Sequence, residues 1–255
     1  METGLFDIPA PIFSLIDGVL ADFLSESIRL VFWGLAAGAG SMGLYWLTSP
    51  QKKLEIAKQD SIAARQALSA YDGDFDGLFP LMTRSLSTSF RHLGLALGPA
   101  LLGSLPVIFL MVWMSGGYGY RLPEPGAQIR ISTIGQTGPL AWSNGAQAEA
   151  GQGHTVAWPA DSETLTLSGE GGDALLTLPL AHAVPVKHKR VWWNMLFANP
   201  LGSLPDEAPV EAIEIGLEAR VFMPFGPGWM QGWEAPFILV VLFASVAIKL
   251  IFRIR

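Results

Sequence analysis

Carboxylates and histidines are the side chains of this sequence whose types and spacing could do chemistry. The run Asp72-Gly73-Asp74-Phe75-Asp76-Gly77 places acids at the first, third and fifth positions of a calcium-binding EF-hand loop. Position 12 of such a loop supplies a bidentate Glu, and here that position is Thr83. The run therefore favours a polar turn between two helices over a calcium site.

The sequence offers few other residues for metal binding or nucleophilic catalysis. The chain has no cysteine, which excludes thiolate zinc sites, iron–sulfur ligation and cysteine nucleophiles. The histidines do not pair with carboxylates at metal-ligand spacing (His92, His154, His182 and His188). We therefore expect no catalytic residue, no cofactor and no metal, and a protein that is not an enzyme.

The composition indicates an integral membrane protein. Of 255 residues, 15% are charged and 50% are hydrophobic, whereas a soluble domain carries about 25% charged residues. The net charge of −6 gives no broad basic field, so we expect no nucleic-acid partner. The lipid bilayer is the first expected partner, and a sizeable part of the chain is expected to lie outside it.

Three apolar windows are long enough to cross a bilayer as helices, which takes about 20 residues. They predict transmembrane helices over residues 28–48, 93–114 and 233–252. Basic residues then set the orientation. Residues 48–92 hold six, the leader holds none, and the end of the chain holds Lys249, Arg253 and Arg255. This predicts an N-terminus outside, a cytoplasmic segment 49–92 and a cytoplasmic tail 253–255.

The segments between the predicted spans differ in character. The leader, residues 1–27, has apolar side chains on one side, which predicts an amphipathic helix on the outer membrane surface. Residues 49–92 read as two helices joined by the Asp72–Gly77 turn, a cytoplasmic helical hairpin.

Residues 115–232 are predicted to form an extracytoplasmic β-rich domain, sandwich-like. Alternating stretches separated by turn residues indicate short strands at 128–132, 155–158, 164–168, 174–178 and 212–222. Residues 186–197 read instead as a helix with an apolar face. Trp192, Trp193 and Phe197 are candidates for a surface that rests on lipid or on a partner.

Small residues and prolines predict how the spans pack. Gly34 and Gly38 in the first span, and Gly94 and Gly98 in the second, let helices approach closely. Pro99 and Pro106 each remove a backbone hydrogen bond and predict a bent second span. A bend whose freed carbonyls must find partners is compatible with a polar groove between the spans.

This layout resembles the Oxa/YidC/Alb insertase superfamily, in particular its three-span branch with the insertase-like subunit of the ER membrane complex and its prokaryotic relatives. The segments that carry the resemblance are Leu78-Phe-Pro-Leu-Met-Thr-Arg84, Leu105-Pro106, the glycine- and proline-rich 223–233, and the Lys249–Arg253 end of the third span. The resemblance covers roughly residues 5–114 and 222–255. The chain departs from the family pattern in its large outer domain and in the lack of a charge at mid-membrane depth.

The resemblance implies a membrane-protein insertase- or chaperone-like factor of a prokaryotic inner membrane, with a periplasmic β-domain and other membrane proteins as clients. Side chains below the second span are then candidates for client or lipid contact, together with its two prolines (Leu78, Phe79, Met82, Arg84, Arg91, Pro99 and Pro106). The alternative is a non-catalytic subunit or assembly factor that docks through its β-domain. A transporter or channel is weakened by the scarcity of intramembrane charge.

Overall fold

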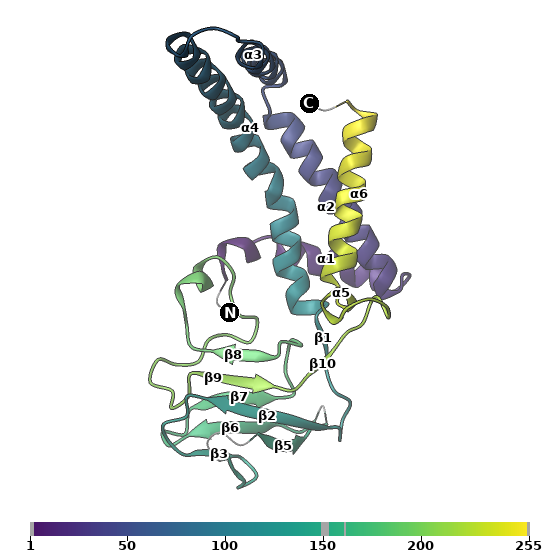
Figure 1. The fold of residues 1–255 in the computed structure, drawn as a ribbon. Coiled ribbons are helices and arrows are strands. Elements are labelled where there is room, and N and C mark those ends of the chain that lie inside the picture. The colour runs from purple at the N-terminus through teal and green to yellow at the C-terminus, as the bar shows by residue number, and fades with distance from the viewer. Residues whose placement is uncertain (1–2, 149–152, 161, 254–255) are drawn as a thin grey trace. The chain divides into compact units, whose positions relative to one another are not determined.

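The computed structural model describes residues 3–148, 153–160 and 162–253 and divides the chain into two compact units (Figure 1). One unit comprises residues 1–24 and 109–236, and the other comprises residues 25–108 and 237–255. The predicted tail residues Ile254 and Arg255 lie outside the described part of the chain. The fold is therefore a helical unit and a unit built around β-sheets.

Three long apolar helices dominate the chain. They are α2 (Glu26–Thr48), α4 (Phe75–Gly117) and α6 (Glu234–Ile251), and each is long and apolar enough to cross a membrane. Their bounds enclose or closely match the three predicted spans. Three such helices and a β-sheet domain are compatible with the expected helical membrane protein that carries a β-domain.

The hairpin consists of α3 (Gln51–Ser69) and the first half of α4. Helix α3 turns Leu54, Ala57, Ser61 and Ala64 inward, a spacing of three and four residues that places them on one face. The turn falls between Ala70 and Phe75, where the Tyr71 hydroxyl donates a hydrogen bond to the Asp74 carbonyl oxygen at 2.9 Å. The acidic run thus ends one helix and begins the next, as the sequence predicts.

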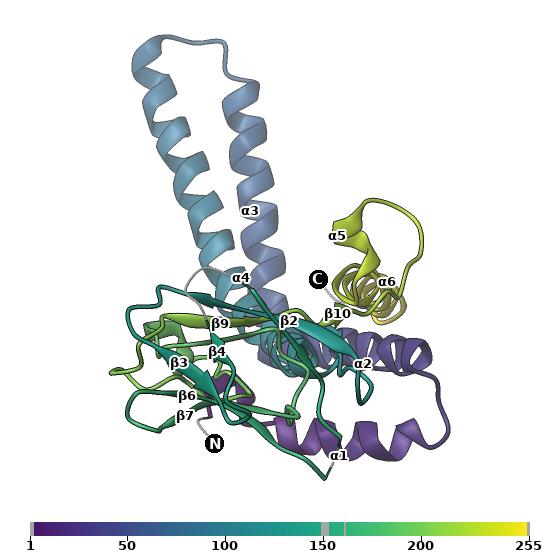
Figure 2. The ribbon, with the colours of Figure 1, turned by 90° about the horizontal axis from the view of Figure 1, so that it is seen from below.

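Helix α4 is one continuous helix of 43 residues although it contains Pro80, Pro99 and Pro106. The sequence predicts a hairpin helix and a separate span, and the structure joins them. In Figure 2, α6 is seen end-on, whereas α3 and the first part of α4 lie side by side and are seen along their length, running toward the top of the view. Within the helical unit, the hairpin therefore runs across the direction of α6.

The β-domain is built from two four-stranded antiparallel sheets (Figure 1). The first has the order β5-β2-β9-β8, with β5 (His154–Ala157), β2 (Gln128–Ile134), β9 (Ala212–Ile215) and β8 (Val186–His188). The second has the order β4-β3-β6-β7, with β4 (Gln147–Ala148), β3 (Leu140–Trp142), β6 (Leu165–Gly169) and β7 (Ala174–Leu178). Alternating burial such as that of β2 gives each sheet one apolar face.

The two apolar faces share one core. Ile129, Ile131 and Ile213 from the first sheet and Leu167 and Leu178 from the second belong to the same cluster of buried side chains. Leu167, Leu178 and Ile213 are completely buried. The two sheets thus pack on one common core, as the alternating pattern predicts for a sandwich.

The leader belongs to the same unit as the β-domain. It forms a 3-10 turn η1 (Leu5–Asp7) and helix α1 (Ala10–Ala21). A two-stranded ribbon joins β1 (Tyr120–Arg121) to β10 (Glu218–Ala219), and a short helix α5 (Gly228–Gln231) precedes α6. The end of α4 contacts α1, because Tyr118 donates to Asp17 at 2.6 Å and Trp113 donates to Ser14 at 2.9 Å.

Two secondary-structure predictions are corrected. Residues 186–197 do not form a helix; they form β8 and a 3-10 turn η2 (Trp192–Met195). Lys187 and His188 pair with β9, so the sheet takes the start of a segment whose local pattern looked helical. The predicted strand 212–222 is interrupted and becomes β9 and β10, which belong to different sheets.

Candidate functional site

A groove of about 390 Å³ lies between α2, α4 and α6 inside the helical unit. Ten described residues from the three helices line it (Ser41, Met42, Tyr45, Ala100, Gly103, Ser104, Val107, Val241, Ser245 and Lys249). A buried water needs only about 10–15 Å³ of such volume, so the groove has room for several waters or for side chains of another molecule.

A glycine keeps the two walls close at one side of the groove. A Cβ atom added at Gly103 would lie 3.2 Å from the Ser41 carbonyl oxygen and 3.2 Å from the Tyr45 Cβ. Helix α4 therefore approaches α2 closely at this point, and α6 completes the groove with Val241 and Ser245. The approach depends on the small side chain of Gly103.

Hydroxyl groups distinguish the groove from an ordinary packing defect. Ser41, Tyr45, Ser104 and Ser245 contribute oxygen atoms among otherwise apolar walls. The Ser104 hydroxyl donates to the Leu101 carbonyl oxygen of its own helix at 2.7 Å. The buried Ser41 hydroxyl has no hydrogen-bond partner among the described residues. Leaving such a group unpaired in an apolar medium is costly, but the Ser41 oxygen is buried and does not itself open into the groove.

Lys249 is the charged residue among the described residues that line the groove, and it lies in the last turn of α6. Ser41 and Tyr45 lie in the second half of α2. In the predicted topology, Lys249 and the pair Ser41 and Tyr45 therefore lie in the cytoplasmic half of their spans. The rest of the lining carries no charge.

The glycines predicted to pack helices behave differently from one another. A Cβ at Gly34 would lie 2.7 Å from the Val240 Cγ1, and one at Gly38 would lie 2.7 Å from the Ala244 Cβ. Both therefore pack α2 against α6. No atom of the described residues outside their own helix lies within 4 Å of a Cβ at Gly94 or Gly98, so none of the described helices packs against them.

The two prolines of the predicted second span lie inside α4. Pro99 is buried, and the Pro106 Cβ would lie 3.3 Å from a Cβ at Gly40. Pro106 thus packs on α2 beside the groove, which also contains Ser104 and Val107. Gly40 extends the glycine series of the first span that predicts close helix packing, whereas Gly103 is a contact position that the sequence reasoning missed.

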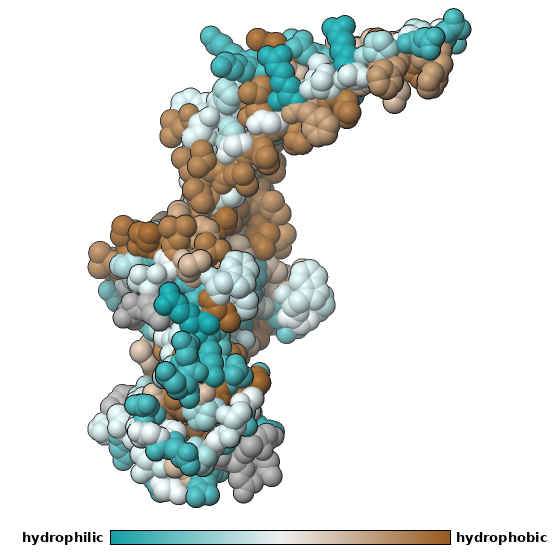
Figure 3. Space-filling view, turned by 90° about the vertical axis from the view of Figure 1, so that its left-hand side faces the viewer, coloured by the Kyte–Doolittle hydropathy of each residue, from teal (hydrophilic) through white to brown (hydrophobic). Residues whose placement is uncertain are grey.

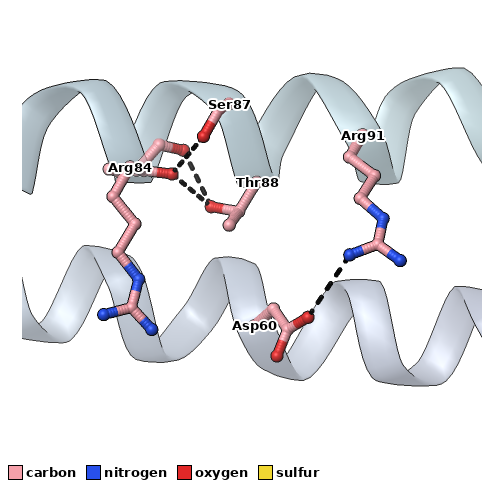
Figure 4. A network of polar contacts seen from close by, with 6 residues as sticks. Asp60, Arg84, Ser87, Thr88 and Arg91 are labelled. Carbon is pink, nitrogen blue, oxygen red and sulfur yellow. Dashed lines mark hydrogen bonds and ion pairs between the residues drawn. The ribbon is translucent and has the colours of Figure 1, made fainter.

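The candidate contact residues of the hairpin fall on different faces of α4. Phe79 is 69% exposed and Met82 is 50% exposed, whereas Leu78 is half-buried. Figure 4 shows the Arg84 and Arg91 side chains extending over α3. Arg91 forms an ion pair with Asp60 at 3.9 Å, at an exposed position where such a pair adds little stability.

The predicted aromatic surface of the β-domain lies on η2 and on Phe197 just after it. Trp192 is 71% exposed, and its ring contacts that of Trp193 edge to face at 5.8 Å. Trp193 and Phe197 are also exposed. The structure thus brings the three predicted aromatic residues together on one short exposed turn.

The leader is attached beside this turn by a carboxylate that sequence reasoning missed. Asp7 accepts hydrogen bonds from the Ala198 backbone N–H at 2.7 Å and the Gly4 N–H at 3.0 Å. The Phe6 N–H donates to the Leu196 carbonyl oxygen at 2.7 Å. No local pattern points to this contact, because the partners are separated by about 190 residues.

No protein-family model, curated protein or solved structure matches this chain. The insertase resemblance consequently stays a prediction from the sequence.

Proposed function

We propose that this protein is a membrane-protein insertase- or chaperone-like factor that accommodates hydrophobic segments between its three spans. The single observation that carries the proposal is the groove of about 390 Å³ lined by α2, α4 and α6. Three helices that only anchored the chain would have no need of a groove with hydroxyl-bearing walls.

The lining suits a segment that is mainly apolar but still carries backbone or side-chain polar groups. Met42, Val107 and Val241 offer apolar contact, and methionine adapts its shape to varied partners. The hydroxyl of Ser245 offers a hydrogen bond to polar groups that would otherwise be unpaired in lipid. The chemistry of the groove therefore favours broad acceptance over selection of one ligand.

The charge distribution defines which clients the groove favours. Helix α2 carries Arg29 near its start, and α6 carries Lys249 near its end, so neither helix places a charge at its middle. Both long side chains can extend to a membrane interface. We therefore expect hydrophobic clients rather than electrostatic capture of a strongly acidic translocated tail.

The proposed location is a prokaryotic inner membrane, with the groove and hairpin toward the cytoplasm and the β-domain outside. Basic residues in 48–92 and their absence from the leader support this orientation. Reporter fusions in the hairpin and in the β-domain test it. A hairpin reporter that is active outside the membrane would overturn the orientation and with it the cytoplasmic groove.

Photo-crosslinking tests the client proposal directly. A crosslinkable residue replaces Val107 or Ser245 in the groove, and the control replaces Phe243, a 74% exposed side chain of α6. We expect the groove positions to capture many newly made membrane proteins and the control to capture mainly lipid. Capture of one stoichiometric neighbour at the groove positions would instead indicate a subunit.

The second candidate function is a non-catalytic subunit or assembly factor that docks through its β-domain. The observation that favours it is the exposed segment of η2 and the residues just after it, where Trp192, Met195 and Phe197 all present apolar surface. Exposed tryptophan and methionine are enriched where proteins contact each other. A crosslinker at Trp192 that yields one product of fixed stoichiometry, with an empty groove, would favour this function over the first.

A further inference from the structure

Helix α4 carries a long exposed row of apolar side chains, which we call the α4 stripe. Its members are 50–80% exposed (Phe75, Phe79, Met82, Leu86, Phe90, Leu93, Leu97 and Leu101). They follow one another at steps of three and four residues, so they lie on one side of the helix. An apolar row of this length is unusual on a water-facing helix.

The stripe passes without interruption from the span into the hairpin. Leu93, Leu97 and Leu101 lie in the predicted span, where exposed leucine side chains face lipid. Phe90, Leu86 and the residues before them continue the same row through the hairpin. The hairpin part is thus continuous with a surface that already contacts lipid.

The course of the hairpin directs the stripe toward the same side as the spans. Figure 2 shows the hairpin running across the direction of α6. In Figure 3, hydrophobic residues cover the side of the hairpin turned toward the spans, and hydrophilic residues cover much of the opposite side. A flat bilayer surface around the spans would meet the hydrophobic side.

Most polar residues of α4 occupy other faces, although the exposed Thr83 adjoins the stripe and donates its hydroxyl to the Phe79 carbonyl oxygen of the same helix at 3.0 Å. Arg84, Ser87 and Arg91 are exposed and lie away from the stripe around the helix, with both arginines extending over α3 (Figure 4). Ser85 and Ser89 face α3, where the Ser89 hydroxyl lies 3.1 Å from that of Ser61. The stripe itself contains no charged or polar side chain.

The spacing of the stripe favours a flat surface over a second helix. From Phe75 to Leu101 the steps average about 3.7 residues, whereas a left-handed coiled coil requires about 3.5. A row at the natural helix period stays on one side of a straight helix and matches a plane. This argues against a left-handed coiled coil with a second copy of the hairpin as the occupant.

We infer that the α3–α4 hairpin lies on the bilayer surface, with the α4 stripe from Phe75 to Phe90 buried at the boundary between lipid headgroups and acyl chains. Because the stripe is uncharged, a zwitterionic lipid is sufficient for this contact. Phe79 and Met82 are then lipid contacts in the resting protein and do not form an open site for clients.

The absence of cysteine from the chain makes the test direct, because single-cysteine variants of the full-length protein take one label each. An environment-sensitive fluorophore is placed at Met82→Cys or Leu86→Cys on the stripe. The matched control is Ser87→Cys, a conservative change on an exposed neighbouring face of the same helix. All three proteins are placed in phosphatidylcholine nanodiscs with no client present.

At positions 82 and 86 we expect blue-shifted emission, quenching by phosphatidylcholine that carries a nitroxide near the headgroup, and protection from aqueous iodide. At position 87 we expect the reverse. Iodide quenching at all three positions would overturn the inference, because the stripe would then face water. Protection of 82 and 86 from both quenchers would also overturn it, because a protein would then cover the stripe. Neither outcome depends on whether the groove receives clients.

Discussion

The β-domain and the three long helices keep their apolar side chains in different places. The sandwich turns Leu167, Leu178 and Ile213 into a core from which water is fully excluded. In the most apolar windows of α4 and α6, only 17% of residues are buried inside the protein, and in α2 the share is 33%. The β-domain therefore provides its own apolar environment, whereas the helices depend on lipid for theirs.

The two regions therefore differ in how strongly their stability depends on tight packing and in whether they leave room for another molecule. A dense core tolerates few changes of volume, since packing in protein interiors approaches that of organic crystals. Helices that contact one another at a few small residues leave room between them, as they do at the groove. Substitutions in the packed core are therefore expected to lower stability more than substitutions at lipid-facing positions of the helices.

The largest effect is expected in the sandwich core. Residues 121–224 should fold as a separate fragment with one cooperative unfolding transition, because about 100 residues can bury a sufficient core. Leu167→Ala, at a fully buried position, should lower its free energy of unfolding by about 2–5 kcal/mol. Denaturant unfolding followed by tryptophan fluorescence measures this value.

The matched change in the helical unit is Phe243→Ala, at a side chain that is 74% exposed. It should leave the thermal stability of the full-length protein in nanodiscs nearly unchanged, within about 0.5 kcal/mol. A fragment 121–224 without a cooperative transition, or a large loss at Phe243, would contradict the contrast between the two regions.

The contact between α2 and α6 should be the sensitive point of the helical unit. Gly38→Val places side-chain atoms where a Cβ alone would be 2.7 Å from the Ala244 Cβ, so the helices must separate. We expect a loss of about 1–3 kcal/mol, as for other overpacked sites. Gly43→Val is the control, because no described atom lies within 4 Å of its Cβ position. Equal losses for both variants would mean that α2 and α6 do not pack at Gly38.

A smaller effect is expected at the attachment of the leader. Asp7→Ala removes the acceptor of the Gly4 and Ala198 N–H groups, and hydrogen bonds to a charged group contribute about 1.5–3 kcal/mol. Since this residue is only partly buried, the lower end applies, and the leader should detach without unfolding the sandwich. Limited proteolysis between η1 and α1 measures the detachment. Asp22→Ala, an exposed acid of the leader, should not change the cleavage rate.

The smallest effect concerns Lys187 on β8. Burial lowers the pKa of this lysine below its ordinary 10.5, and its Nζ donates to the Leu175 carbonyl oxygen at 2.9 Å across to the other sheet. Between the lowered pKa and 10.5 the unfolded chain binds more protons than the folded one, so stability rises with pH in that window. Lys187→Met should abolish this rise. Unfolding of the 121–224 fragment at several alkaline pH values measures it, and an unchanged slope would contradict the assignment.

Much of the architecture depends on local sequence patterns and was therefore predictable. The spans follow from apolar windows of sufficient length, and a window needs no distant partner to be recognised. The alternating segments at 174–178 and 128–132 correspond to β7 and to most of β2 for the same reason. Residues 186–197 were misread because pairing of Lys187 with β9 outweighed an apolar pattern that also fits a helix.

The candidate site was only partly predictable. Gly34 and Gly38 were expected to pack a helix, but their partner α6 and the unpartnered state of Gly94 and Gly98 within the described chain appeared only in the structure. The groove hydroxyls of Ser41, Ser104 and Ser245 are visible in the sequence as polar residues within apolar windows. That these three serines lie around one groove was not visible in the sequence.

By itself, the sequence determined which segments are apolar enough to cross a bilayer, which alternate as strands, and where turns interrupt them. Tertiary structure alone decided that Gly103 brings α4 onto α2 beside a groove, and that Asp7 joins the leader to the turn at Ala198. The physical reason is that composition and periodicity act over a few neighbouring residues. The rotation and crossing of helices, and hydrogen bonds across about 190 residues, depend on how the whole chain packs.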